Sequence, residues 1–167
     1  ATSQEEVVLA YPGVEAVDRL ADLLAEHRLH PVAVLLTHGH LDHTFSVVPV
    51  CQAREIPAYI HPADRPQLTD PWSWIGAAPG TPLFGRGPLT IVEPDDVRPL
   101  EDNTTVELAG LSLAVRHAPG HTPGSVGFGL AAPDAPAFFS GDLLFAGSIG
   151  RFDLPGGDGQ AMLTSLA

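Results

Sequence analysis

The sequence predicts a mixed α/β domain, and two patterns carry that prediction. Between two short apolar runs, at residues 7–10 and 32–36, lies a stretch with helical periodicity, which is the order of a strand–helix–strand unit. From residue 105 onward the chain instead carries short runs that alternate or stay apolar over the length of a strand. With 167 residues, the whole chain (1–167) fits about one domain.

The first elements are the most regular. We expect a strand over residues 7–10, because its apolar run stops at the turn-forming Tyr11-Pro12-Gly13. The pattern over residues 14–30 predicts an amphipathic helix that Pro31 ends, and residues 32–36 predict a strand buried on both faces. The apolar stripe of this helix consists of Val14, Val17, Leu20, Leu23 and Leu24.

The middle of the chain is less regular. Residues 45–55 predict a helix, although Pro49 leaves its start uncertain, and residues 58–60 predict a strand. Residues 61–99 are rich in proline, glycine and tryptophan. That composition predicts mostly loop, with one short strand near residues 89–92.

The last third of the chain predicts strands joined by tight turns. A hairpin is expected over residues 105–115, with its turn at Ala109-Gly110. Two further strands are expected at residues 125–130 and 137–140. Residues 160–167 predict the opening of a helix.

Composition predicts a folded, acidic protein. Hydrophobic residues make up 44% of the chain and charged residues 17%, which is enough apolar surface for a core. The formal net charge of -12 repels phosphate backbones and anionic lipids, so we expect neither nucleic acid nor a membrane as partner. No apolar run reaches bilayer-spanning length, and residues 1–6 do not resemble a signal peptide. The single cysteine, Cys51, suits a reducing compartment, and we expect a cytoplasmic protein.

The strongest chemical signal is a group of histidines directly after the second apolar run. His38, His40 and His43 fall within six positions, with Asp42 among them. Imidazole nitrogen and carboxylate oxygen are ligands that zinc accepts. Residues two apart in an extended stretch point the same way, so His38 and His40 can meet one metal ion. A turn aided by Gly39 can then aim Asp42 and His43 at a second point.

Two more candidate ligands follow strand-like runs. In the segment H-A-P-G-H-T-P-G-S, two glycines and two prolines hold His121 in a tight loop. In F-F-S-G-D, an apolar run ends at Asp142. Alone, such an aspartate is more often a turn residue or a helix cap. Beside the histidine group, both residues become candidate ligands of one metal centre.

These motifs together resemble the metallo-β-lactamase superfamily. The likeness spans roughly residues 32–158 and rests on T-H-G-H-L-D-H, H-A-P-G-H-T-P-G-S, F-S-G-D-L-L-F and G-S-I-G-R-F-D-L-P-G-G-D. The last segment is most similar to the glyoxalase II-like (hydroxyacylglutathione hydrolase-like) hydrolases of bacteria. The resemblance implies an αββα sandwich, in which two mixed sheets lie face to face, helices lie outside, and the site lies at one edge.

The resemblance also implies that six side chains form a centre for two metal ions. His38, His40 and His121 would hold the first ion, Asp42 and His43 would help to hold the second, and Asp142 would bridge the two. The ions would be zinc, one or two per chain, with iron or manganese as alternatives.

The implied activity is hydrolysis of a small-molecule thioester. Two metal ions that share a water generate hydroxide near neutral pH and polarise the carbonyl group that it attacks. Asp42 would orient that metal-bound hydroxide, which makes it the expected catalytic residue. Thr37 and Ser140 would hold ligands in place. The acyl group, the thiol and the oligomeric state are left open.

Other activities are compatible with the same residues. A persulfide dioxygenase would use one iron held by a facial triad, which His38, His121 and Asp142 could supply. A lactonase or β-lactamase shares the metal site. A nuclease of this superfamily usually carries an inserted domain, for which 167 residues leave no room. A metal-binding remnant without activity is the alternative that is not an enzyme.

The chain departs from the family pattern at both ends. The family usually continues beyond the position of Asp158 to a P-G-H-G-type turn, whose histidine completes the second metal site. It also usually has an earlier strand, and a D-P-G turn where this chain has Tyr11-Pro12-Gly13. We therefore expect a domain that is truncated at both ends and incomplete at the C-terminus. A one-metal enzyme and a degenerate paralogue are the alternatives.

Overall fold

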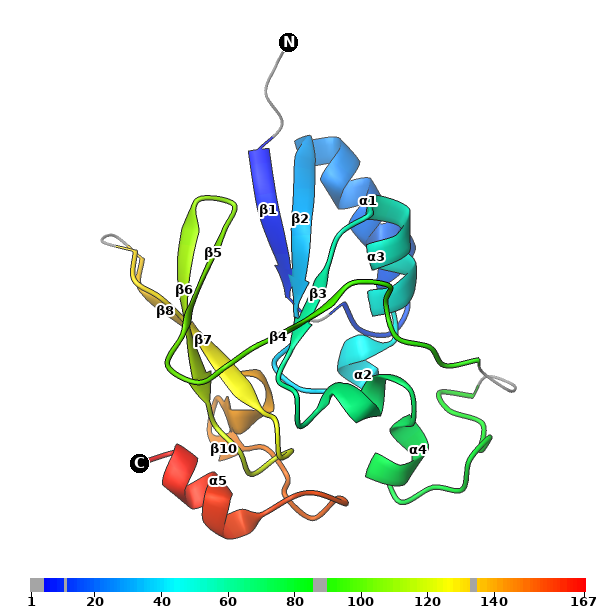
Figure 1. Cartoon of the computed structure of the whole chain (residues 1–167), viewed down its shortest axis with the longest axis vertical. Helices are drawn as coiled ribbons and strands as arrows, with labels where there is room; N and C mark the ends of the chain where they lie inside the picture. The colour runs from blue at the N-terminus through cyan, green and yellow to red at the C-terminus, as the bar shows by residue number, and fades with distance from the viewer. Residues whose placement is uncertain (1–4, 11, 86–89, 133–134) are drawn as a thin grey trace.

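Two four-stranded sheets lie face to face in the computed structural model, which describes residues 5–10, 12–85, 90–132 and 135–167 (Figure 1). One sheet is parallel, in the order β1–β2–β3–β4, and the other is antiparallel, in the order β5–β6–β7–β8. Within the described residues neither sheet is mixed, contrary to the expectation. The strands are β1 (Glu5–Ala10), β2 (Leu29–Leu35), β3 (Ala58–Ile60), β4 (Val97–Pro99), β5 (Thr105–Leu108), β6 (Leu111–His117), β7 (Val126–Leu130) and β8 (Ala137–Phe139).

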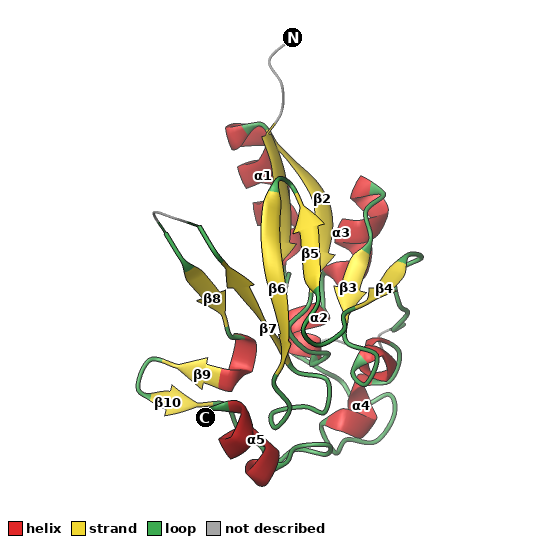
Figure 2. Cartoon of the chain, turned by 60° about the vertical axis from the view of Figure 1, so that its left-hand side comes forward, coloured by secondary structure: helices red, strands yellow, loops and turns green. Residues whose placement is uncertain are grey.

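Helices flank this pair of sheets (Figure 2). Helices α1 (Ala16–His27) and α3 (Val47–Arg54) pack on the outer side of the parallel sheet. Two facing sheets with α1 and α3 outside confirm the expected sandwich. Helix α5 (Gly159–Ser165) lies beyond one end of the antiparallel sheet, where Met162 packs against Ala118 and Leu143. The shorter elements are α2 (Leu41–Thr44), η1 (Arg65–Leu68), α4 (Pro71–Trp74), η2 (Gly141–Leu143) and the hairpin strands β9 (Leu144–Phe145) and β10 (Ser148–Ile149).

Strand β2 connects the two hydrophobic cores, because successive side chains of a strand point to opposite faces. Val34 and Leu36 are fully buried in the core beneath α1 and α3. Leu35, between them, packs in the core shared with Val115 and Phe128 of the antiparallel sheet. The prediction of a strand buried on both faces is confirmed.

The boundary between α1 and β2 differs from the prediction. Helix α1 ends at His27, because Arg28 adopts a left-handed backbone (φ 55°), and β2 begins at Leu29. Pro31 therefore lies inside the strand and does not end the helix. Strand β3 pairs with β2 only from Val34 onward, so the stretch around Pro31 has a neighbour on one side only. A residue without an N–H group is tolerated at such an edge.

The predicted strand near residues 89–92 is not found. Leu89 lies outside the described residues, and residues 90–92 form no strand. The chain instead extends the parallel sheet with β4, which pairs with β3 from Ala58 to Ile60. This three-residue strand is half exposed, so no alternation marks it in the sequence.

The predicted hairpin is confirmed as β5–β6. Its two turn residues, Ala109 and Gly110, both have positive φ, at 52° and 71°. Positive φ at both positions is the requirement of a type I′ turn, whose twist matches that of the flanking strands. The helix predicted over residues 45–55 is found as α3, whereas α2, which lies before it within the histidine group, was not predicted. Pro49 sits in the first turn of α3, where no N–H donor is needed.

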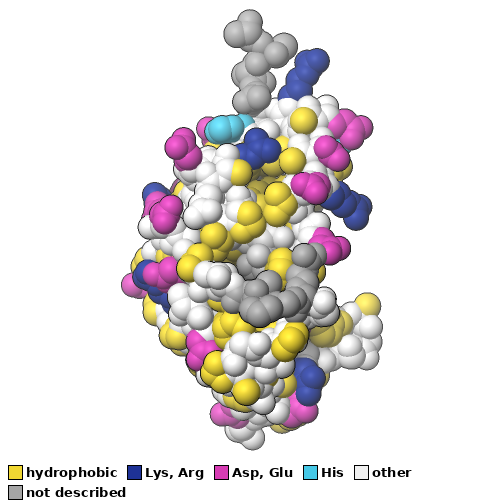
Figure 3. Space-filling view, turned by 90° about the vertical axis from the view of Figure 1, so that its right-hand side faces the viewer, with side chains coloured by type: hydrophobic (Ala, Val, Ile, Leu, Met, Phe, Trp, Pro, Cys, Tyr) yellow, Lys and Arg dark blue, Asp and Glu magenta, His cyan; other side chains and the backbone are white. Residues whose placement is uncertain are grey.

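The face that carries α1, α3 and α4 is shown in Figure 3. Charged side chains lie mainly toward its margins, and apolar side chains gather near its middle. Helix α1 exposes Asp18, Arg19, Asp22 and Glu26, as its periodicity predicted. None of the described helices is long and apolar enough to cross a membrane.

Replacing Gly120 by alanine is expected to destabilise the protein. Gly120 has φ +144°, and a Cβ there would lie 2.4 Å from the Cα atom of Met162 in α5. Such overpacking typically costs about 1–3 kcal/mol. Chemical denaturation of Gly120→Ala should show this loss. Gly129→Ala is the control, since its Cβ would lie at an ordinary 3.8 Å from Ala114; an equal loss in both variants would contradict the account.

Candidate metal centre

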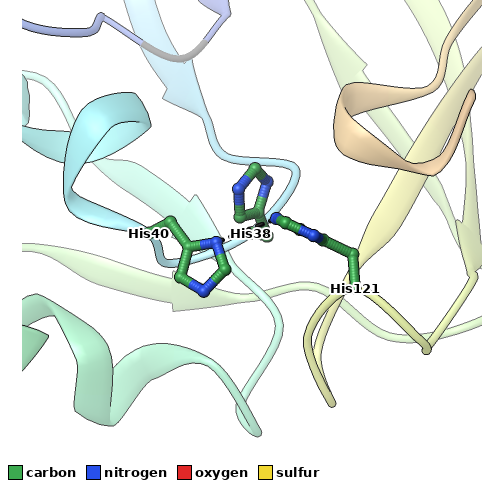
Figure 4. A group of neighbouring side chains, drawn as sticks. All are labelled: His38, His40 and His121. Carbon is green, nitrogen blue, oxygen red and sulfur yellow. Dashed lines mark hydrogen bonds between the residues drawn. The ribbon is translucent and has the colours of Figure 1, made fainter. Parts of the chain in front are cut away.

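Three loops at one edge of the sandwich bring the predicted ligands together. His38 and His40 follow the end of β2, His121 lies in the loop between β6 and β7, and Asp142 lies in η2. Figure 4 shows the rings of His38, His40 and His121 converging from the first two of these loops. All three side chains are buried, with exposed fractions of 1%, 6% and 4%.

The spacing of these three imidazoles suits one metal ion. One ring nitrogen of each histidine lies within 4.8 Å of the corresponding atoms of the other two. The nearest pair, Nδ1 of His40 and Nε2 of His121, is 2.8 Å apart. Two nitrogens that bind one tetrahedral zinc at about 2.0–2.1 Å stand roughly 3.4 Å apart. Small shifts of the rings would therefore bring all three nitrogens into coordination distance.

Hydrogen bonds orient the rings and leave particular nitrogens available. Nδ1 of His121 lies 2.7 Å from the carbonyl oxygen of Arg151, which fixes Nδ1 as the N–H and leaves Nε2 as the lone pair. The Thr37 hydroxyl lies 3.2 Å from Nδ1 of His38. Within the described residues, Nε2 of His38 and Nε2 of His40 are buried without a hydrogen-bond partner. A cation is the kind of ligand that would satisfy a buried lone pair at Nε2 of His38, whereas His40 would bind it through Nδ1, which faces His121, and carry its ring proton on Nε2.

A second group adjoins the first and shares one residue with it. Ligand atoms of His38, His43 and Asp142 also lie within 4.8 Å of one another. Asp142 Oδ1 is 3.2 Å from Nε2 of His43, and its Oδ2 is 3.6 Å from Nε2 of His121. The Asp142 carboxylate thus lies between the two groups, where the resemblance places a bridging ligand.

Asp42 is set apart from both groups. Its side chain is 60% exposed, and its Oδ2 lies 3.8 Å from Nε2 of His43. It lines the cavity above the histidines together with Asp142 and Arg151. The position suits a group that meets substrate or water, and direct ligation of a metal by Asp42 stays a prediction.

The environment keeps the imidazoles of His38 and His40 neutral. Burial, reinforced by the neighbouring imidazoles, holds the pKa of His38 well below its usual value, and burial with nearby His121 lowers the pKa of His40 to about 4. Burial also acts to lower the pKa of His43, but the hydrogen bond and charge of Asp142 outweigh it and raise that pKa. Neutral imidazole is the form that binds metal, so His38 and His40 need lose no proton near pH 7.

The cavity above the site holds about 420 Å³ and is lined mainly by apolar side chains. Its lining includes Ile75, Leu83, Phe84, Phe145 and Leu154. Arg151 also lines it, and forms a two-point ion pair with Asp153 at 2.7 and 3.0 Å. A cavity of this kind can receive a small molecule beside the predicted ligands.

Several residues near the site were not predicted. Gly39 was expected to provide a turn, yet its requirement is space: a Cβ there would lie 2.7 Å from the Asp64 carbonyl oxygen and from Cβ of Gln67. Asp64 and Gln67 are both buried beneath it. One available signal was that Asp64 follows the strand at residues 58–60, because carboxyl ends of neighbouring parallel strands meet at one edge. Ser140, predicted to hold a ligand, donates to the Leu144 carbonyl oxygen across η2, which carries Asp142, and its role stays a prediction.

Removing one of the three buried histidines is expected to cost one metal ion. In His40→Ala, which removes a ligand of the first group alone, the chain should bind about one ion fewer than the wild type, because two imidazoles make an incomplete tetrahedral site. Elemental mass spectrometry after dialysis against zinc measures the ratio. His27→Ala, which alters an exposed histidine at the end of α1, is the control; equal zinc contents in the two variants would count against the site.

The metal-free protein is expected to lose stability in mild acid. The pKa of His40 is about 4 in the folded chain, against 6.5 for an ordinary histidine, and that of His38 is also lowered. Between these pH values the unfolded chain binds more protons than the folded chain, so the free energy of unfolding falls as pH drops from 6.5 toward 4. His43 contributes in the opposite direction.

Urea denaturation at pH 7 and pH 5 in the presence of a chelator tests this expectation. The His40→Asn variant should lose less stability than the wild type over that interval. A loss as large as that of the wild type would show that His40 is not the source of the pH dependence.

Sequence comparison gives the relatives of the chain. The family model of the Metallo-beta-lactamase superfamily matches residues 8–167. A protein of Mycobacterium tuberculosis is 41% identical over 167 residues, covering 96% of this chain and 72% of its own. The probable metallo-hydrolase YqgX of Bacillus subtilis is 33% identical, with 98% and 73% covered. The hydroxyacylglutathione hydrolase GloC of Haemophilus influenzae is 29% identical, also with 98% and 73% covered.

Solved structures agree with this assignment. The B3 metallo-beta-lactamase BLEG-1 superposes with a TM-score of 0.82 at 36% identity, covering 99% of this chain and 75% of that one. TTHA1623, in a di-iron-bound form, superposes with a TM-score of 0.75 at 42% identity, covering 95% of this chain and 73% of that one. The chain therefore spans about three quarters of the length of these relatives. From the matching family model and the identity to these relatives, the chain belongs to the metallo-β-lactamase superfamily.

Proposed function

We propose that this chain is a metal-dependent hydrolase of thioesters, of the glyoxalase II type. The observation that carries the proposal is the pair of adjoining ligand groups, which share His38 at the base of an open cavity. The likeness to a hydroxyacylglutathione hydrolase of Haemophilus influenzae supports the thioester class. We assign the first ion to His38, His40 and His121, and a second ion to His43 and Asp142 with Asp142 between the two.

The metal that we propose is zinc. Its preference for imidazole and carboxylate at short distance fits the donor set, and three histidines with an open side suit a catalytic rather than a structural site. Iron is the main alternative, because the same donors accept it and a relative at 42% identity holds two iron ions.

Each residue of the site would have a separate role in the hydrolysis. A bound divalent ion would lower the pKa of its water toward about 7 and polarise a substrate carbonyl. The neutral His38 and His40 hold the site without taking up the proton that is released. The exposed carboxylate of Asp42 faces the cavity, where it is placed to orient the attacking water and accept its proton. The apolar cavity walls would exclude bulk water around the acyl group.

The direct test is turnover of an S-lactoyl thioester by the zinc-loaded protein, followed by release of free thiol. We expect thiol release with zinc and its loss after chelation. Asp42→Asn should lower kcat by about 10²–10⁴-fold, as for loss of a general base, and its zinc content, measured on the same samples, separates this role from ligation of a metal. Asp22→Asn, on the exposed side of α1, is the matched control.

Other outcomes would replace the proposal. No thiol release by protein with its ions bound would exclude the thioesterase. Consumption of oxygen with a persulfide by iron-loaded protein would indicate the dioxygenase instead. Turnover of a lactam or lactone in place of the thioester would indicate one of the other hydrolases of this fold.

A further inference from the structure

We propose that Asp64 is a positioning residue of the first metal site, which holds the two ligand loops at the spacing that one ion requires. The inference rests on the proposed function in that it takes His38, His40 and His121 as the ligands. Asp64 follows β3 at the start of η1 and belongs to neither ligand loop. Its side chain is fully buried, with an exposed fraction of 0%.

The Asp64 carboxylate receives three hydrogen bonds from the two ligand loops. Its Oδ2 accepts from the backbone N–H of Gly39 at 2.9 Å and from the hydroxyl of Thr122 at 2.6 Å. Its Oδ1 accepts from the backbone N–H of Gly124 at 2.7 Å. Gly39 lies between His38 and His40, and Thr122 directly follows His121. One carboxylate is thus bonded to a residue adjacent to each of the three ligands.

The packing around Asp64 leaves the loops little freedom. A Cβ at Gly124 would lie 2.7 Å from the backbone nitrogen and Oδ1 of Asp64, and one at Gly39 would lie 2.7 Å from its carbonyl oxygen. Both loops therefore approach Asp64 as closely as glycine permits. The Thr122 hydroxyl is fixed further by the Ser125 hydroxyl at 2.7 Å. We call the three hydrogen bonds from Gly39, Thr122 and Gly124 to Asp64 the Asp64 clamp. It sets the ligand positions before an ion binds, which is how hydrogen bonds around a site raise metal affinity.

The chemistry of the three hydrogen bonds indicates which substitution of Asp64 would break them while keeping the shape of the side chain. All three partners are donors, and an ionised carboxylate offers acceptors on both oxygens. Charge-assisted bonds of this kind are about twice as strong as neutral ones. In Asp64→Asn the shape is kept, but in either orientation an NH₂ group faces at least one backbone N–H. The variant therefore breaks the clamp without changing any ligand.

The test is Co²⁺ titration of the metal-free protein, followed by the visible absorption of the bound ion, with thermal unfolding of the same metal-free samples. Asp64→Asn is expected to weaken binding of the first Co²⁺ by about 10- to 100-fold, measured at a temperature where each variant is folded. Asp102→Asn is the control: its carboxylate also accepts a backbone N–H, that of His117 at 2.9 Å, but it is exposed and its partner belongs to β6. Its affinity should match the wild type.

A second pair of variants decides the question if Asp64→Asn does not fold. Thr122→Val removes one donor to Asp64, and Thr122→Ser keeps it. Weaker Co²⁺ binding in Thr122→Val with recovery in Thr122→Ser supports the clamp. Wild-type affinity in Asp64→Asn, or in both Thr122 variants, overturns it, even if the melting temperature falls, because a purely structural role would change only stability. A wild-type protein that binds no Co²⁺ would overturn the proposed function as well.

Discussion

The site depends on the packing of one sheet against the other. His38 follows a strand of the parallel sheet and His121 lies in a loop of the antiparallel sheet, far away in the sequence, so the contact between the sheets is needed to bring them together. Leu35, Val115 and Phe128 are buried in the core at that contact, and each such side chain contributes about 1.5–3 kcal/mol. The N–H of Val126 also donates to the carbonyl oxygen of Thr37 at 2.7 Å, which joins the end of β2 to the start of β7 beside the ligands.

Burial at this junction has a chemical consequence. Imidazoles enclosed at the edge of two cores are costly to charge, and the lowered pKa values of His38 and His40 express that cost. Neutral rings with unsatisfied lone pairs are then available to a cation. Burying these imidazoles without a bound ion would cost free energy of folding. Metal binding is therefore expected to stabilise the edge of the sandwich that carries the site.

Much of the fold followed from periodicity, and the exceptions have identifiable causes. The apolar runs of β2 and β3 were visible because these strands are buried, and β1 and α1 were visible from apolar side chains that pack partly buried against the cores. Pro31 was assigned to a helix end, since the sequence does not show that it lies where β2 has a single neighbour. Strand β4 was missed because its half-exposed residues leave no alternation.

The site residues were predicted unevenly, because some lie in recognisable sequence motifs and others are identified only by tertiary contacts. His38, His40, His43, His121 and Asp142 stand in dense motifs, and the structure places all of them in the two ligand groups. Asp42 stands in the same motif, but its side chain is 60% exposed and belongs to neither ligand group. Asp64 lies in no recognisable motif. Its proposed role is evident only from three hydrogen bonds to segments that are remote in the sequence. Local patterns reveal ligands, whereas the residues that hold them require the tertiary structure.

The most direct test of the account is a crystal structure of the zinc-loaded protein with anomalous diffraction at the zinc edge. The account predicts an anomalous peak within about 2.0–2.2 Å of one nitrogen each of His38, His40 and His121. A peak elsewhere, or no peak at this position in crystals that contain zinc, would contradict the claim that the two sheets build a metal centre at this edge.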